Sequence, residues 1–80
     1  MKFCKMKILY FGVLSEIAGK SEENLDFSGQ ISELKNVLSE MYPEFAKQRF
    51  QVSLNQLIVE ETQLVNPGDE IALLPPFTGG

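Results

Sequence analysis

The 80-residue sequence contains no histidine and only one cysteine, Cys4. Histidine is the usual general base near neutral pH and the commonest metal ligand. A lone cysteine without a histidine partner forms neither a catalytic pair nor a zinc cluster, and it cannot close an internal disulfide. Three isolated glycines, Gly12, Gly19 and Gly29, lack the spacing of a phosphate-binding loop. We therefore expect neither a self-sufficient catalyst nor a metal site, and interpret Cys4 as a small buried apolar residue.

Basic residues and long apolar runs are also scarce. Seven lysines and arginines stand against eleven acidic residues, which gives a net charge of −4. This balance argues against nucleic acid or an anionic membrane as the main partner. No apolar run approaches the length that spans a membrane, and the start of the chain lacks a signal-peptide pattern. We expect a cytoplasmic protein with neither nucleic acid nor membrane as a partner.

The length and the hydrophobic fraction of 44% predict one folded domain over residues 1–80, with a modest core. Alternating apolar residues predict strands, and a 3.6-residue apolar period predicts one main helix. The expected elements are a strand over about Phe3–Phe11, a helical turn within Gly12–Lys20, a strand over Glu22–Phe27, the main helix over Ile31–Met41, short strands over Val52–Leu54 and Leu57–Val59, and a last strand over Glu70–Leu74. This order predicts an α+β domain, with the helix packed on one face of a mixed sheet.

Three local expectations accompany this outline. Ser28 is a plausible cap for the main helix. The acidic pair Glu22-Glu23 is interpreted as a solvated strand edge that discourages the addition of another strand. The apolar stripe of the main helix is expected in the core, and its members are Ile31, Leu34, Val37, Leu38 and Met41.

Some apolar residues break the expected alternation between core and solvent. Phe11, Ile58 and Leu74 are predicted on the outer side of their strands. Such residues indicate an apolar docking face. The alternative is that they meet inside the fold.

The chain ends Pro75-Pro76-Phe77-Thr78-Gly79-Gly80. Proline fixes φ and lacks an N–H, so the pair should end the strand pairing and begin an extended arm with a reach of roughly 20 Å. Two glycines without side chains can enter a slot that is too narrow for other residues. The reactive group delivered there would be the α-carboxylate of Gly80. The alternative interpretation is a frayed terminus.

The element order, the length and the Gly-Gly end resemble the ubiquitin-like β-grasp fold. Within that fold, the sequence is similar to the family of molybdopterin synthase small subunits, also called molybdopterin-converting-factor small subunits. The segments that carry the similarity are Lys7–Gly12, Leu54-Asn55-Gln56, Pro67-Gly68-Asp69-Glu70 and Leu74–Gly80. The double proline is the most specific part, because sulfur carriers of thiazole synthesis share the fold and the Gly-Gly end but usually lack it.

The resemblance implies a sulfur carrier that is not an enzyme on its own and binds no cofactor. A ubiquitin-activating-like adenylating enzyme, with ATP and magnesium, would convert the Gly80 carboxylate into an acyl-adenylate, and a sulfur donor protein would turn that into a thiocarboxylate. The carrier would then dock on the large subunit of molybdopterin synthase and insert its tail. There it would give sulfur to a pyranopterin precursor, which forms the dithiolene of molybdopterin.

The resemblance also assigns roles to individual residues. Gly80 would bear the sulfur, Gly79 would permit close approach, and Pro75, Pro76, Phe77 and Thr78 would complete the inserted tail. The partner-binding positions would be Phe11, Ile58 and Leu74. Ser15 departs from the pattern, because some members carry arginine there. The alternatives are a sulfur carrier for thiazole synthesis or tRNA thiolation, a ubiquitin-like protein modifier, and a structural adaptor.

Overall fold

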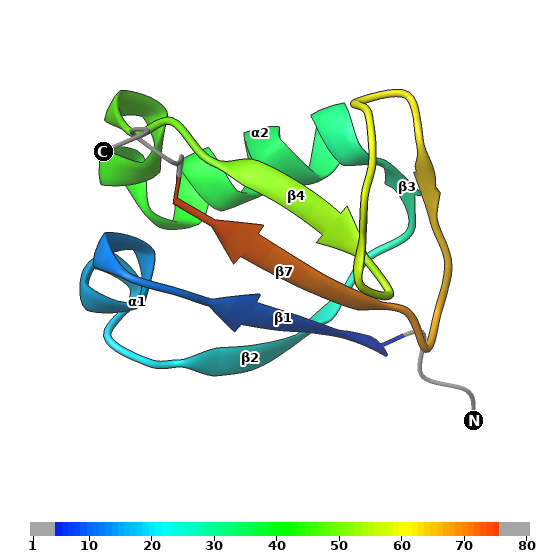
Figure 1. The fold of residues 1–80 in the computed structure, drawn as a ribbon, viewed down its shortest axis with the longest axis horizontal. Coiled ribbons are helices and arrows are strands. Elements are labelled where there is room, and N and C mark those ends of the chain that lie inside the picture. The colour runs from blue at the N-terminus through cyan, green and yellow to red at the C-terminus, as the bar shows by residue number, and fades with distance from the viewer. Residues whose placement is uncertain (1–4, 76–80) are drawn as a thin grey trace.

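The computed structural model of the chain describes residues 5–75 (Figure 1). The elements in chain order are β1 Lys5–Tyr10, α1 Val13–Ala18, β2 Glu22–Asp26, β3 Gly29–Gln30, α2 Ile31–Met41, the 3₁₀ helix η1 Pro43–Lys47, β4 Gln51–Leu54, β5 Leu57–Ile58, β6 Leu64–Val65 and β7 Glu70–Leu74. The predicted bounds of the main helix and of the last strand are confirmed. The first strand ends one residue earlier than predicted, because the carbonyl of Phe11 already accepts the N–H of Leu14 in the next turn. Cys4 lies outside the described residues.

Five strands form one mixed sheet in the order β2-β1-β7-β4-β5. The first and last strands, β1 and β7, run parallel to each other, and the other three pairings are antiparallel. Figure 1 shows β1 and β7 side by side in the middle of the sheet, with α2 crossing one face. The predicted α+β class, with one main helix on one face of a mixed sheet, is confirmed.

The core lies between α2 and the sheet face that α2 covers. Its buried side chains come from all parts of the chain: Met6, Ile8, Tyr10, Leu14, Ile31, Leu34, Leu38, Phe45, Val52, Val65, Ile71 and Leu73. Val37 of the predicted helix stripe is only half-buried and does not join this core, and the prediction is also wrong at Met41, which is 39% exposed. This residue occupies the last position of α2, where the chain is already leaving the sheet toward η1.

A small second sheet, which the sequence analysis missed, holds the start of α2. In it β3 pairs antiparallel with β6, and Gln30 lies opposite Leu64. The predicted Ser28 cap is wrong, because Gln30 is the N-cap and forms a reciprocal capping box with Glu33. The Gln30 N–H donates to Glu33 Oε1 at 2.9 Å. This arrangement satisfies donors that would otherwise lack partners at the helix start.

Both predicted turns are confirmed. Asn55 and Gln56 have φ values of 49° and 77°, which fit the two central positions of a type I′ turn between β4 and β5. In the turn before β7, the Asp69 N–H donates to the Asn66 carbonyl at 3.1 Å. The Asp69 carboxylate accepts the Asn66 N–H in return, at 2.8 Å. These turns set the positions at which β5 and β7 begin.

The interpretation of Glu22-Glu23 as a solvated edge is wrong for Glu23. Its Oε1 atom accepts hydrogen bonds from the hydroxyls of Tyr10 and Tyr42, both at 2.8 Å. Its Oε2 atom lies 3.5 Å from the Lys20 ammonium. Because β2 pairs with β1 through Ile8 opposite Glu23, this carboxylate lies on the core side of the sheet. Glu23 therefore links the edge strand β2 to Tyr42, the C-cap residue of α2.

The cluster shifts the pKa values of its members. Burial and the hydrogen bond to Glu23 raise the pKa of the Tyr10 hydroxyl far above its ordinary range, and the same two causes raise the pKa of Tyr42. Burial alone would raise the pKa of the Glu23 carboxyl, but the two tyrosine hydroxyls and Lys20 stabilise its charged form and lower the pKa overall. Glu23 therefore stabilises the fold as a carboxylate.

We predict that Glu23→Ala lowers the free energy of unfolding by about 1–3 kcal/mol, because the buried Tyr10 hydroxyl loses its acceptor. The neighbouring Glu22→Ala is the matched control. Among the described residues, the Glu22 carboxylate forms one ion pair, with the exposed Lys7 ammonium at 3.8 Å, so its loss should cost less than about 1 kcal/mol. Urea unfolding of the two variants measures the difference, and equal costs would contradict a structural role for Glu23.

Candidate functional site: the outer sheet face and the root of the tail

The sheet face opposite α2 carries a row of four side chains across four strands. Leu9 in β1 lies opposite Ala72 in β7, and Ala72 lies opposite Ser53 in β4. Ser53 lies opposite Ile58 in β5. Because directly paired residues point to the same side of a sheet, these four share one face. We call this surface, together with Phe11 and Leu74, the outer face.

Phe11 and Leu74 extend the outer face toward the end of the last strand. Leu74 follows Ala72 by two residues and therefore points to the same side. The register pairs Tyr10 with Leu73, so its continuation brings Phe11 beside Leu74. Phe11 is 44% exposed and Ile58 is 57% exposed, so these two side chains do not meet inside the fold. The structure thus places the three predicted partner-binding residues on one side of the sheet, and their role in binding stays a prediction.

The root of the tail rests on the backbone of Gly12. A Cβ atom at position 12 would lie 3.1 Å from Cγ of Pro75, closer than ordinary packing allows. The φ of Gly12 is 62°, a value that glycine adopts without steric cost. Gly12 therefore lets the chain turn into α1 while Pro75 packs against it. The remaining predicted tail residues, Pro76, Phe77, Thr78, Gly79 and Gly80, lie outside the described residues.

Ser15 acts inside this turn. Its hydroxyl donates to the Gly12 carbonyl at 2.7 Å, and its backbone N–H donates to the same oxygen at 3.1 Å. A serine at this position therefore closes the first turn of α1 beneath the tail root. The sequence analysis noted Ser15 only as a departure from the family pattern, and did not foresee this contact.

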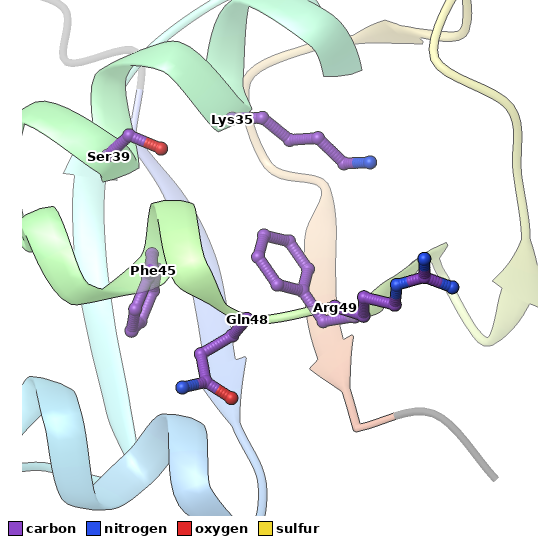
Figure 2. Close-up of a pocket in the computed structure, with 6 residues that line it drawn as sticks. Lys35, Ser39, Phe45, Gln48 and Arg49 are labelled. Carbon is purple, nitrogen blue, oxygen red and sulfur yellow. The ribbon is translucent and has the colours of Figure 1, made fainter. Parts of the chain in front are cut away.

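A groove of about 410 Å³ lies on the helix side of the sheet, where the chain enters β4 (Figure 2). The sequence analysis missed it, because its lining comes from α2, from η1 and from the segment that joins η1 to β4. The lining residues are Lys35, Ser39, Phe45, Gln48, Arg49 and Phe50.

Residues 5–75 show neither a cluster of metal-ligating side chains nor a helix that could span a membrane. Within this range, no group of three or more histidine, cysteine, aspartate or glutamate side chains is arranged to hold a metal ion. None of the helices described there is long and apolar enough to cross a membrane.

Comparison with known sequences gives near-complete matches. A model of the ThiS family matches residues 8–80. The molybdopterin synthase sulfur carrier subunit of Caenorhabditis briggsae is 31% identical over 94% of this chain and 96% of its own length. The human protein of that name is 32% identical over 96% of both chains. The Mycobacterium tuberculosis protein of that name is 30% identical over 95% of this chain and 98% of its own.

Solved structures share the fold at lower identity. A putative molybdopterin converting factor subunit 1 from Pyrococcus furiosus has a TM-score of 0.85 and 19% identity, covering 91% of this chain and 98% of its own. Small archaeal modifier protein 1 from Methanosarcina acetivorans has a TM-score of 0.77 and 23% identity over all of both chains. A chain in the complex of subunits 1 and 2 of the Helicobacter pylori molybdopterin-converting factor has a TM-score of 0.69 and 23% identity, covering 95% and 99%. These similarities confirm the predicted β-grasp fold.

We predict that the outer face contributes little to the stability of the isolated domain. Ile58→Ala should change the free energy of unfolding by less than about 1 kcal/mol, because the side chain is largely in water. The same substitution at Ile71, which is completely buried, should cost about 2–5 kcal/mol. Denaturant unfolding of both variants measures this, and a large loss from Ile58→Ala would show that this residue belongs to the core.

Proposed function

The chain belongs to the ThiS family, and we propose that it carries sulfur for the synthesis of the molybdenum cofactor. The observation that carries the proposal is the similarity, along almost the whole chain, to relatives named for this role. The proposal assigns the transferred sulfur to Gly80, which forms a diglycine with Gly79 beyond the double proline Pro75-Pro76.

The proposed chemistry takes place at the Gly80 carboxylate. A carboxylate resists attack by nucleophiles until one of its oxygens becomes part of a leaving group. A partner enzyme supplies that group from ATP with magnesium: a carboxylate oxygen attacks the α-phosphorus, pyrophosphate leaves, and an acyl-adenylate forms. The terminal sulfur of a persulfide on a donor protein then attacks the acyl carbon and displaces AMP, which gives an acyl disulfide between Gly80 and the donor. Two thiols of a reductant cleave its S–S bond and are oxidised to a disulfide, which releases the donor as a thiol and leaves a thiocarboxylate on Gly80.

The final acceptor in this proposal is a pyranopterin precursor held by the large subunit of molybdopterin synthase. The thiocarboxylate sulfur is transferred to the precursor, and Gly80 returns to a carboxylate when water attacks the acyl carbon. These steps need catalytic groups that a chain without histidine does not offer. The partners supply the catalytic groups, and a narrow tail brings the reacting atom into their dry pockets.

In the proposed complex, the described domain positions the tail. β7 leads directly into the tail, and Pro75 is held against Gly12, so the tail leaves from a fixed point on the sheet. The outer face lies beside this exit and offers Phe11, Ile58 and Leu74 to the large subunit. Burial of the part of each side chain that is still exposed contributes at most about 1.5–3 kcal/mol to binding, because the domain already covers part of each one.

The carrier chemistry is tested by the intact mass of the chain after incubation with ATP, magnesium, an adenylating enzyme of this pathway and its sulfur donor. We expect a gain equal to the replacement of one oxygen by sulfur, located in the C-terminal peptide. A chain that lacks Gly80 keeps residues 5–75 unchanged and is the matched control, which should gain no mass. An unchanged mass of the full chain with active partners would reject the proposal, and higher-mass conjugates in a cell extract would indicate a protein modifier instead.

The docking face is tested by two neighbouring substitutions in β5. Ile58→Arg places a charge on the outer face, and we expect it to raise the Kd for the large subunit by about ten- to a hundredfold, the equivalent of one buried apolar side chain. Leu57→Arg is the matched control, because Leu57 is 71% exposed but points to the opposite side of the strand. Titration calorimetry gives both constants. Equal effects of the two changes would mean that the outer face is not the docking surface.

A further inference from the structure

The groove of about 410 Å³ combines cationic side chains with an aromatic floor, and we call it the basic groove. Its floor is formed by Phe45 and Phe50, whose ring centres lie 5.9 Å apart in an edge-to-face arrangement. The Lys35 ammonium lies 5.4 Å from the centre of the Phe50 ring. Ser39 and Gln48 add a hydroxyl and an amide to its walls, and Arg49 lines the groove with its guanidinium directed away from Phe45 and Gln48 (Figure 2). The groove can therefore bind a negative charge next to an apolar group.

The strand register places the basic groove at the root of the tail. Gln51 at the start of β4 lies opposite Leu74 at the end of β7, in an antiparallel pair. Arg49 and Phe50 immediately precede Gln51, and Pro75 immediately follows Leu74. The segment that lines the groove and the segment that begins the tail therefore leave the sheet at the same end. The outer face and the basic groove lie on opposite sides of this exit.

The charges of the groove are only partly compensated. Three lysines of the described residues form ion pairs with glutamates, in the pairs Lys7–Glu22, Lys20–Glu23 and Lys35–Glu61. Arg49 forms no ion pair within residues 5–75, and neither does the exposed Lys47 two residues before it. In a chain with a net charge of −4, this end of the sheet keeps two uncompensated positive charges close together.

We propose that the basic groove binds an acidic side chain, adjacent to an apolar one, on the protein that receives the tail. This inference rests on the proposed function. Guanidinium groups bind carboxylates through two parallel hydrogen bonds, which makes Arg49 the natural centre of the contact. The apolar neighbour packs on Phe50, and the charge of Lys47 adds to the attraction. A partner that surrounds the tail root meets both the outer face and the basic groove.

The position of Arg49 also separates this contact from the nucleotide chemistry. Gly80 lies five residues beyond Pro75, which is up to roughly 16–18 Å along an extended tail. A tail that is inserted in an extended form carries the activated carboxylate, and with it the phosphates of ATP, away from the groove. The acidic side chain that binds the basic groove lies on the partner, at the entrance of the pocket that receives the tail. Its charge attracts the domain and so guides the approach of the tail.

The test compares Arg49→Gln with Lys5→Gln in binding to the purified large subunit of molybdopterin synthase. Both substitutions remove one exposed positive charge that forms no ion pair within residues 5–75, but Lys5 lies at the start of β1, at the end of the sheet away from the tail. At low salt we expect Arg49→Gln to raise the Kd about tenfold, mainly through a slower association rate, and to weaken the dependence on salt. Lys5→Gln should leave the Kd within twofold of that of the unsubstituted chain. Arg49→Lys should restore only part of the loss, because an ammonium cannot form the two parallel bonds.

Three outcomes would overturn the inference. If Arg49→Gln binds as tightly as the unsubstituted chain while Ile58→Arg weakens binding, the basic groove has no role and the proposed function stands. If the unsubstituted chain fails to bind the large subunit at all, both proposals fall. If ATP alone shifts the amide resonances of residues 47–50, the groove takes a phosphate and not a partner carboxylate. An unchanged melting temperature of each variant shows that the fold is retained, as expected for exposed side chains.

Discussion

The parallel pairing of β1 with β7 is the constraint on which the rest of the structure depends. It brings the first and last strands of the chain together in the middle of the sheet. Parallel neighbours end at the same edge, so the end of β1 and the end of β7 share one location. Pro75 therefore comes to lie against Gly12, although the two residues are far apart in sequence. Any substitution that shifts this register moves the exit of the tail.

The two faces of the sheet differ in how much of their apolar surface is buried. The face under α2 carries the fully buried Ile8, Ile71 and Leu73, while the outer face keeps large apolar groups in water. Large apolar side chains exposed to water favour aggregation, so the presence of Phe11 and Ile58 on this face calls for a function. The two glutamates at the start of β2 differ in their roles. Glu22 keeps its charge at the edge, and Glu23 completes the buried tyrosine cluster.

Much of this architecture could be predicted from the sequence, because the major elements carry strong local signals. The apolar period over residues 31–41 and the alternation over residues 70–74 gave the correct bounds of α2 and β7. Phe11 and Ile58 were correctly placed outside the core, because the alternation of core and solvent positions puts them on the outer side of their strands. These signals lie within one element and need no knowledge of its neighbours.

The features that escaped prediction depend on contacts between distant segments. The strand β3 has two residues, too few to show a period, and it exists only because β6 arrives beside it more than thirty residues later. The same contact moves the helix cap from Ser28 to Gln30, whose backbone is held by the small sheet. Glu23 looked like a surface charge because its two tyrosine donors come from β1 and from the end of α2. The basic groove was missed for the same reason.

The two proposed contacts together explain why the tail root needs more than a flexible joint. A tail that swings freely loses conformational entropy when it enters a slot, and that cost weakens binding. Here the first tail residue is packed on Gly12, the outer face lies on one side of the exit, and the basic groove lies on the other. A partner that holds both sides fixes the direction of the tail before its tip is inserted. In the proposed complex, the specificity for the partner then comes from the domain, which fixes where the tail begins.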